Sequence, residues 1–337
     1  MIVIWEVTRA CALACNHCRA EAIARADPNE LNLQEAERFI DQVARAMPKI
    51  FILTGGDPMY RRDLVHLIEY ATRKGLRVAM SPSATPRFLK ADLGVFKDAG
   101  LKAISLSLDG ASRESHDAFR GVRGTWGWTL QAFRAVRQAG ISLQINTTIT
   151  RRNLGEYNAF VAMLDQLQPD VWSLFQLVPT GRGKSGDLLT GRQMEDLFNR
   201  LCDLAPVVPY KIKTTEGMHF RRVALQRWEQ SGGARPSIST ISDGRGFVFV
   251  SHTGEIFPSG FLPISAGNVR AYELIDIYRN APLFLELRDL SRLKGKCGRC
   301  EYRAICGGSR ARAYAMTGDY LAEEPLCIYE PKEKQNP

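Results

Sequence analysis

The chain has 337 residues, 45% of them hydrophobic and 24% charged, which is typical of a globular protein with one large domain and room for a smaller unit. No apolar run approaches the roughly 18–20 residues of a membrane-spanning helix, so no membrane partner is expected. The apolar start at residues 1–7 also lacks the basic region and cleavage site of an export signal. A cytoplasmic location is therefore predicted, where clustered cysteines more often hold metal than form disulfides.

Lysine and arginine together number 45 against 36 acidic residues, which gives a formal net charge of +9. This excess is compatible with a plain basic surface and equally with an anionic partner, such as a phosphorylated ligand or a polycarboxylate. A nucleic-acid partner is not expected, because the chain has neither a lysine-rich tail nor a basic stripe interleaved with aromatic residues.

Short apolar runs rich in β-branched residues alternate with stretches of helical spacing over the first 180 residues. The predicted strands are residues 2–8, 49–55, 76–81, 103–109, 142–150 and 171–178, and the predicted helices are residues 32–46, 61–74, 87–99, 125–139 and 154–167. This alternation predicts an α/β fold with a parallel sheet and right-handed crossovers. Because it stops near residue 205, short of the ~250 residues of a complete eightfold barrel, a partial (β/α)6 TIM barrel is expected. An open doubly wound sheet fits the same pattern.

In the last third of the sequence the alternation of predicted strands and helices gives way to a different pattern. Residues 246–260 alternate like a hairpin with a turn at Thr253 and Gly254, and a cysteine-rich segment follows. We therefore divide the chain into a barrel at residues 1–205, a bridging region at 206–245 and a small C-terminal cysteine-rich module at 246–337.

Three cysteines follow the first predicted strand at the spacing C-x3-C-x2-C, namely Cys11, Cys15 and Cys18. Three thiolates can bind three irons of a [4Fe–4S] cluster and leave the fourth iron with an open position. His17 directly precedes Cys18 and would be strained in reaching the same cluster, so it is expected to pack beside it. An open iron can chelate the amino and carboxylate groups of a small ligand, and S-adenosylmethionine is such a ligand.

Other unusual residues also follow predicted strands, so they would share one rim of the sheet with the cysteines. Gly55 and Gly56 would let the backbone approach a ligand closely, and Asp57 could accept a hydrogen bond from an ammonium group. A simple Gly-Gly turn with a helix-capping aspartate is the alternative. Further expected contacts of S-adenosylmethionine are Ser81, Ser107, Gln144, Asn146 and Val178. Each polar member of this set could equally cap a helix or bind the backbone.

A second cysteine group lies near the C-terminus and consists of Cys297, Cys300, Cys306 and Cys327. Four thiolates are enough for a closed site. Structural zinc and a [4Fe–4S] cluster would both accept this set, and the spacing alone leaves the choice open.

Together, C-x3-C-x2-C after the first strand, Gly-Gly-acid after the second and Ser-x-Asp after the fourth resemble the radical SAM superfamily over residues 2–180. The C-terminal cysteines resemble its auxiliary-cluster region called SPASM over residues 245–327. The resemblance implies two [4Fe–4S] clusters on the two cysteine groups, S-adenosylmethionine, and an electron donor such as flavodoxin or ferredoxin. Asp57 differs from the more usual glutamate. Ser259 and Arg310 stand where the full SPASM pattern has cysteines, so the first auxiliary cluster is expected to be absent.

Several stretches resemble enzymes of the alternative haem pathway, which act on side chains of siroheme-derived and coproporphyrin-type tetrapyrroles. These stretches are residues 5–22, 54–64, 81–86, 107–122 and 143–154. The resemblance implies a 5′-deoxyadenosyl radical that abstracts hydrogen from a carboxylate-bearing tetrapyrrole side chain, with oxidative decarboxylation or removal of acetate. Arginine suits such carboxylates, and two or three of the arginines after strand ends are expected to touch the substrate. These arginines are Arg19, Arg62, Arg87, Arg120, Arg123, Arg151 and Arg182.

Two rival functions explain part of the same pattern. SPASM-type enzymes often oxidise or crosslink side chains of precursor peptides, so a peptide or protein maturase is the nearer alternative. A non-catalytic electron carrier or a zinc-stabilised binding module would account for the cysteines but would leave the Gly55–Asp57 turn and the polar strand ends without a use. Iron analysis separates the last rival from the others.

Overall fold

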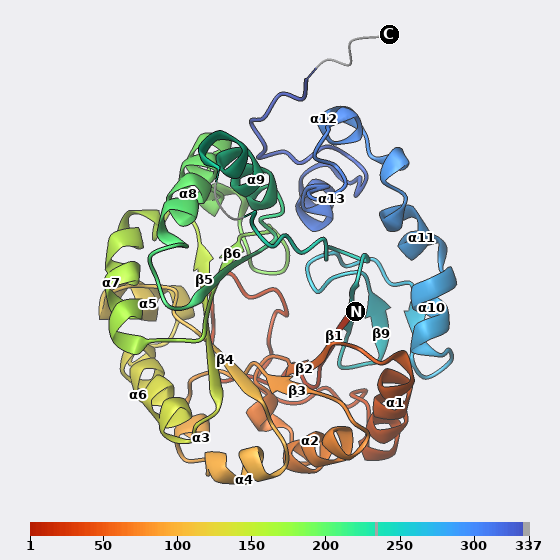
Figure 1. Cartoon of the computed structure of the whole chain (residues 1–337). Helices are drawn as coiled ribbons and strands as arrows, with labels where there is room; N and C mark the ends of the chain where they lie inside the picture. Colours follow the sequence, from red (N-terminus) through yellow and green to blue (C-terminus); the bar gives the residue numbers. More distant parts are fainter. Residues whose placement is uncertain (233–234, 333–337) are drawn as a thin grey trace.

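The computed structural model describes residues 1–232 and 235–332. One curved sheet of ten strands runs through it in the order β10-β9-β8-β1-β2-β3-β4-β5-β6-β7, and helices surround the strands on the outside (Figure 1). Strands β1 to β7 are parallel, β8 pairs parallel with β1, and β9 and β10 are antiparallel additions. The strands are β1 (Ile2–Glu6), β2 (Ile50–Thr54), β3 (Val78–Met80), β4 (Ala103–Ser107), β5 (Ser142–Ile149), β6 (Val171–Gln176), β7 (Lys211–Thr215), β8 (Phe247–Val250), β9 (Glu255–Phe257) and β10 (Gly267–Asn268).

Several helices begin where the sequence supplies N-terminal caps. At the start of α1, Asn32 and Glu35 form a capping box in which each side chain accepts a hydrogen bond from the other's backbone N–H. The helices are α1 (Leu33–Ala46), α2 (Leu64–Arg73), α3 (Pro86–Leu89), α4 (Leu93–Asp98), α5 (Arg113–Arg120), α6 (Thr125–Gln138), α7 (Tyr157–Leu167), α8 (Gly191–Leu204), α9 (Phe220–Ser231), α10 (Leu274–Asn280), α11 (Pro282–Arg288), α12 (Gly295–Arg299) and α13 (Arg310–Thr317).

The main core lies between the sheet and the outer helices, because alternate strand residues point to opposite faces. Trp5 of β1 and Phe51 of β2 are fully buried and pack against Phe39 of α1, with the Trp5 and Phe39 rings 5.4 Å apart. Their strand neighbours Ile4 and Ile52 point the other way and line the interior of the barrel. The interior is therefore free to serve as a binding space. None of the described helices is both long and apolar enough to cross a bilayer.

The partial barrel predicted from the sequence is confirmed, and its sheet continues beyond the six predicted strands. Strand β7 pairs parallel with β6 and lies inside the range predicted to be a bridging region. Its sequence, KIKTT, lacks the apolar pattern of the other strands because its inward-facing side chains line a cavity and need not be apolar. The predicted 87–99 helix is two short helices, α3 and α4.

The predicted hairpin is present as β8 and β9, and it joins the barrel sheet through β1. Residues 233–234 of the predicted bridging region and residues 333–337 of the predicted module lie outside the described residues. The division of the chain at residues 205 and 245 therefore stays a prediction, while the sheet itself crosses both points.

A buried ion pair attaches the C-terminal segment to the barrel. Arg312 of α13 binds Glu324 through Nε and Nη2, at 2.8 and 2.9 Å, and both side chains are almost completely excluded from solvent. The same guanidinium donates to the backbone oxygen of Glu216, directly after β7, at 2.8 Å. Arg312, held by Glu324, thus links the C-terminal segment to the residue that follows β7.

Candidate active site

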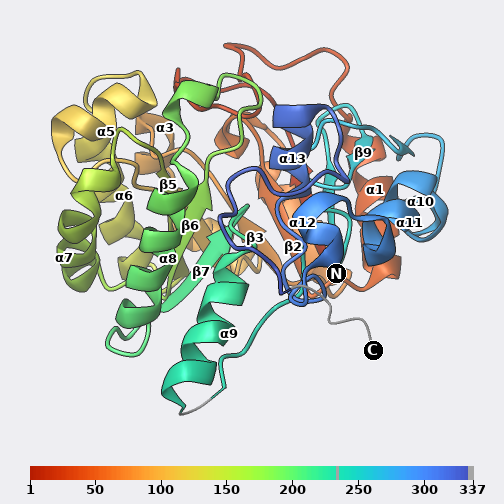
Figure 2. The same cartoon turned by 90° about the horizontal axis from the view of Figure 1, so that it is seen from above.

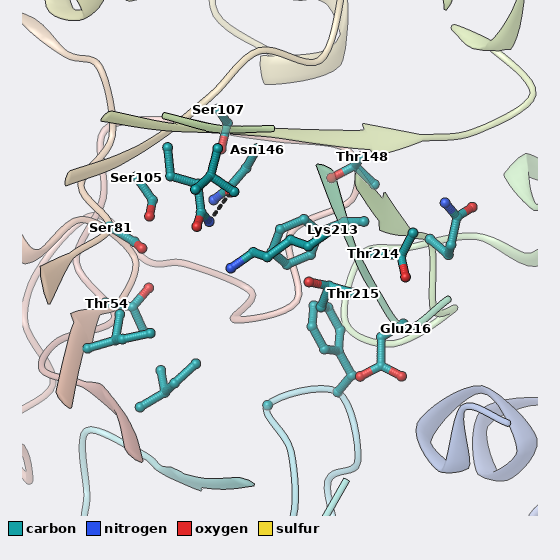
Figure 3. Close-up of a pocket in the computed structure, with 18 of the residues that line it drawn as sticks. Thr54, Ser81, Ser105, Ser107, Asn146, Thr148, Lys213, Thr214, Thr215 and Glu216 are labelled. Carbon is teal, nitrogen blue, oxygen red and sulfur yellow. Dashed lines mark hydrogen bonds between the residues drawn. The ribbon is translucent and has the colours of Figure 1, made fainter. Parts of the chain in front are cut away.

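A cavity of about 1240 Å³ occupies the interior of the barrel. Barrel interiors are usually filled by bulky side chains, but here small residues on and beside β3 and β4, such as Ala79, Ser81, Ala103 and Ser105, leave the space open. Strands β1, β2 and β8 contribute an apolar wall beside them. Figure 3 shows the polar side chains, including Ser81, Ser105 and Lys213, directed into this space. The cavity thus has one apolar side and one side rich in hydroxyl groups.

The loop after β1 lies at one end of the barrel (Figure 2). Its three cysteines line the cavity. Each thiol has a hydrogen-bond donor nearby. Leu13 N lies 3.3 Å from Cys11 Sγ and Ala22 N lies 3.5 Å from Cys18 Sγ. Arg120 Nη1 lies 3.5 Å from Cys15 Sγ. All eight cysteines are free thiols.

This donor set fits a three-thiolate cluster site. N–H donors and a guanidinium stabilise negative charge on sulfur, and iron–sulfur clusters are tuned by such hydrogen bonds. Burial raises the pKa of the Cys11 thiol, so without a bound metal the uncharged form is favoured there. In the described part of the chain, no three His, Cys, Asp or Glu side chains are grouped to hold a single metal ion.

Two glycines bring the end of β2 against the cysteine loop. Gly56 N donates to Thr8 O and Asp57 N donates to Ala10 O, both at 2.8 Å. A Cβ atom on Gly55 would clash with the Thr8 carbonyl, and one on Gly56 would clash with the Arg9 carbonyl. The Gly-Gly pair is therefore required for this close backbone contact.

Replacing Gly56 by alanine is expected to push the cysteine loop away from β2. The change should lower the free energy of unfolding by about 1–3 kcal/mol, because the added methyl group meets backbone atoms that have no room to move. It should also reduce the iron bound after anaerobic reconstitution, measured by colorimetric iron analysis. Gly127→Ala is the matched control, since nothing lies within 4 Å of its added Cβ and it sits in helix α6. Full iron loading of Gly56→Ala would contradict the assignment.

Asp57 lies behind the cavity wall. Its side chain is fully buried and accepts hydrogen bonds from Met59 N at 3.1 Å, Ser83 N at 3.3 Å and Thr85 Oγ1 at 3.4 Å. Burial raises its pKa to about 6. The carboxylate therefore caps the turn at Pro58–Tyr60 and joins the loops after β2 and β3, which agrees with the capping alternative. Direct contact of Asp57 with an ammonium group stays a prediction.

Of the other predicted ligand contacts, Ser81 and Ser107 lie at strand ends, whereas Gln144 and Asn146 lie within β5. One cavity brings together the three cysteines and Gly55, Gly56, Ser81, Ser107, Gln144, Asn146 and Val178. Gln144 Nε2 donates to Asn146 Oδ1 at 2.6 Å, so these two amides form one polar unit on β5. Their contact with S-adenosylmethionine stays a prediction.

A buried charge pair stands beside the cysteine loop, and its pairing was not visible in the sequence. Asp109, after β4, binds Arg120 Nη2 at 2.9 Å and accepts from Thr148 N at 2.7 Å. Burial raises the pKa of Asp109, but Arg120 and the other hydrogen-bond donors outweigh it and hold the pKa below its ordinary value. Asp109 thus orients Arg120 toward Cys15.

His17 packs against this pair rather than standing free as a metal ligand. Its ring centre lies 4.4 Å from that of Phe119, and Nε2 lies 3.9 Å from Asp109 Oδ2. Burial lowers its pKa to about 4, so the imidazole is neutral at pH 7. The position agrees with the expectation that it packs beside the cysteine loop.

Three of the seven arginines after strand ends line the cavity, namely Arg19, Arg120 and Arg182. Arg19 binds Glu6 at 2.9 Å and lies over the Phe249 ring. Arg182 has its Nε and Nη2 atoms buried without a hydrogen-bond partner among the described residues, and its backbone N donates to Cys18 O at 3.0 Å. Four arginines do not line the cavity, namely Arg62, Arg87, Arg123 and Arg151.

The second cysteine group also converges, since Cys297, Cys300, Cys306 and Cys327 line one small pocket. Burial raises the pKa of Cys306 to about 12. Arg310 Nη2 lies 3.8 Å from Cys297 Sγ, and the backbone N of Glu324 lies 3.3 Å from the same sulfur. Four thiols around one pocket, with donors toward sulfur, fit a closed cluster site, and among the described residues they are not grouped tightly enough to hold a single metal ion.

Polar contacts surround the two residues that replace expected cysteines. Ser259 Oγ donates to Glu216 Oε1 at 3.3 Å, and Ser309 Oγ donates to the other oxygen of the same carboxyl. The backbone N of Arg310 donates to Asp243 Oδ2 at 2.9 Å. Burial, together with the nearby Asp243 carboxylate, raises the pKa of Glu216 well above its ordinary value.

Comparison with known proteins agrees with this geometry. The profile of the radical SAM superfamily matches residues 5–163. AdoMet-dependent heme synthase of Oleidesulfovibrio alaskensis is 40% identical over 99% of this chain and 88% of its own length. The enzyme of the same name from Methanosarcina barkeri is 38% identical over 99% of this chain and 97% of its own length. A crystal structure of Streptococcus suis SuiB bound to S-adenosylmethionine superposes with a TM-score of 0.72 at 17% identity, covering 97% of this chain and 77% of that chain.

The family implies a [4Fe–4S] cluster and S-adenosylmethionine, and the three clustered thiols with their donors fit that cluster. The fold agrees as well, because the chain superposes over 97% of its length on SuiB, which was crystallised with S-adenosylmethionine. On the matched profile, the 40% identity along nearly the whole chain and the shared architecture, this protein belongs to the radical SAM superfamily and is an enzyme of radical redox chemistry.

Proposed function

We propose that the enzyme decarboxylates propionate side chains of a coproporphyrin-type tetrapyrrole. In this reaction a propionate loses one hydrogen atom to the 5′-deoxyadenosyl radical, then releases carbon dioxide and one electron, and a vinyl group remains. Removal of an acetate side chain is a close variant. The proposal is supported by the name of the relatives at 38–40% identity, heme synthase.

The observation that carries the proposal is the cavity that joins the three cysteines to a large half-apolar space. A volume of about 1240 Å³ is far more than a single amino-acid side chain needs, and the Phe247 and Phe249 side of the wall suits the face of a flat macrocycle. Arg182 offers unpaired guanidinium donors close to Cys18. A large, flat polycarboxylate matches both the shape and the charge of this space.

Each part of the site has its own task in this proposal. Cys11, Cys15 and Cys18 would hold a cluster, which when bound supplies the electron that splits S-adenosylmethionine into methionine and the 5′-deoxyadenosyl radical. Arg120, held by Asp109, offsets negative charge on Cys15. The enclosing apolar wall excludes water and so limits side reactions of a reactive intermediate.

The C-terminal pocket would hold a second [4Fe–4S] cluster on Cys297, Cys300, Cys306 and Cys327, in a position to accept or relay one electron. Flavodoxin or ferredoxin is the proposed electron donor. Iron and sulfide analysis of anaerobically prepared protein, repeated after all four cysteines are replaced by alanine, tests this part alone. The loss should amount to one cluster, with the other retained.

An anaerobic turnover assay tests the reaction. The iron-loaded enzyme is mixed with dithionite, S-adenosylmethionine and either coproporphyrin III or its iron complex, and the products are separated by chromatography with mass detection. We expect 5′-deoxyadenosine together with a tetrapyrrole that has lost carbon dioxide and two hydrogens per propionate. Deoxyadenosine without any change in either tetrapyrrole would contradict the substrate class and favour a peptide maturase.

A further inference from the structure

Lys213 projects into the middle of the barrel cavity from β7. Figure 3 shows its side chain extended into the open space among hydroxyl-bearing residues of other strands, such as Ser81 and Ser105. Its register partner on β6 is Ser173, a neutral residue. The side chain is accessible to solvent, and that accessible surface faces the cavity that it lines. Lys213 is thus a cation inside the proposed binding space and not on the outer surface of the barrel.

Most other cations around the cavity already have partners. Arg19 binds Glu6, and Arg120 binds Asp109. Arg227 binds Asp203, and Arg221 donates to the backbone oxygens of Ile305 and Ile241. These side chains therefore have much of their hydrogen-bonding capacity taken up by the protein, and they contribute little to an incoming ligand.

Lys213 has no such partner among the described residues. Within residues 1–232 and 235–332, its ammonium group takes part in no hydrogen bond and no ion pair. Arg77 and Arg182, the other unpaired cations of the described lining, lie at a strand start and beside the cysteine loop. Partial removal from bulk water lowers the pKa of Lys213, with no acidic group nearby to offset the effect.

The nearest acidic side chain along the chain is Glu216, and it is engaged elsewhere. Its two carboxyl oxygens accept from Ser259 and Ser309, beyond the end of the strand. The described part of the protein therefore keeps a partly desolvated ammonium in its binding space and supplies no counter-ion to it. An ammonium group that lines the cavity without a counter-ion is free to bind an anionic ligand.

We propose that Lys213 is a specificity-determining residue that binds a carboxylate of the substrate, an assignment that rests on the proposed tetrapyrrole function. Its position on β7, across the cavity from the serine-rich wall of β3 and β4, lets it hold one propionate while the ring lies against the apolar side. The assignment adds a substrate contact on β7, a strand that contributes none of the site residues predicted from the sequence.

Binding of coproporphyrin III and of its tetramethyl ester tests the assignment, because the two share one ring and differ in charge. We measure dissociation constants for both by fluorescence quenching under the same cosolvent. Lys213→Met should weaken binding of the free acid by about 10–100-fold, the range for losing one charge-assisted hydrogen bond, and leave binding of the ester unchanged. Lys213→Arg should restore most of the lost affinity.

Lys211→Met is the matched control. It makes the same substitution two residues earlier on the same strand, at an exposed position that does not line the cavity. An equal loss of affinity for acid and ester in Lys213→Met, or no loss at all, would overturn the assignment while leaving the tetrapyrrole function intact. If the unaltered enzyme binds neither compound, the proposed function fails and the assignment fails with it.

Discussion

Replacing Cys15 by serine will abolish formation of 5′-deoxyadenosine. Cys15 is the most buried thiol of its group and the one that Arg120 contacts, so its loss removes one cluster ligand and leaves a buried guanidinium facing a hydroxyl. A serine oxygen is a poor substitute for thiolate in an iron–sulfur site. Iron content should fall by the equivalent of one cluster, and deoxyadenosine in the dithionite assay should fall below detection.

Cys202→Ser provides the comparison for that experiment. Cys202 is a free, partly buried cysteine of α8 that belongs to neither cysteine group. The same change of sulfur to oxygen should leave iron content and deoxyadenosine formation near those of the unaltered enzyme. A Cys15→Ser enzyme that keeps full iron and forms deoxyadenosine at an undiminished rate would show that the loop after β1 is not the cluster site.

Replacing Arg312 by methionine will destabilise the fold far more than removal of a solvent-exposed charge does. Burial alone raises the pKa of Glu324, but Arg312 outweighs it and lowers the value to about 2, so the carboxylate is ionised at neutral pH. Removing the arginine leaves that charge buried without its partner and also frees the Glu216 carbonyl. The expected loss is about 3–5 kcal/mol in the free energy of unfolding, measured by denaturant titration.

Arg45→Met tests whether that loss comes from burial. Arg45 binds Glu273 at 2.7 Å, but both side chains are about half exposed, at 56% and 45%. A solvent-exposed pair contributes about 0–1 kcal/mol, so this variant should unfold close to the unaltered protein. Equal losses in the two variants would mean that the Arg312 pair does not attach the C-terminal segment in the way the geometry indicates.

The sequence was most informative where chemistry needs residues close together along the chain. The three cysteines at C-x3-C-x2-C are recognisable because they all lie on one loop. The Gly55-Gly56 turn is recognisable because it directly follows one predicted strand. Ser81 and Ser107 could then be placed in the same cavity, because parallel strands end on one edge.

Residues whose role depends on distant partners could not be predicted in the same way. Strand β7 has a single large apolar residue, Ile212, because its inner face lines a cavity. The sequence therefore does not predict a strand there, and nothing in it indicates that Lys213 faces the cavity. The bond from Arg312 to Glu216 spans 96 residues. For Asp57, the sequence allows both a ligand contact and a cap, and the hydrogen bond from Met59 N to its carboxylate shows the cap.

Deuterium transfer is the sharpest test of hydrogen abstraction from a propionate. Coproporphyrin III carrying deuterium on the propionate carbon next to the ring is offered to the iron-loaded enzyme with S-adenosylmethionine and dithionite, and the deoxyadenosine is analysed by mass spectrometry. We expect one deuterium in each deoxyadenosine and a vinyl group on the tetrapyrrole. Unlabelled deoxyadenosine alongside an unchanged tetrapyrrole would contradict radical attack on this side chain.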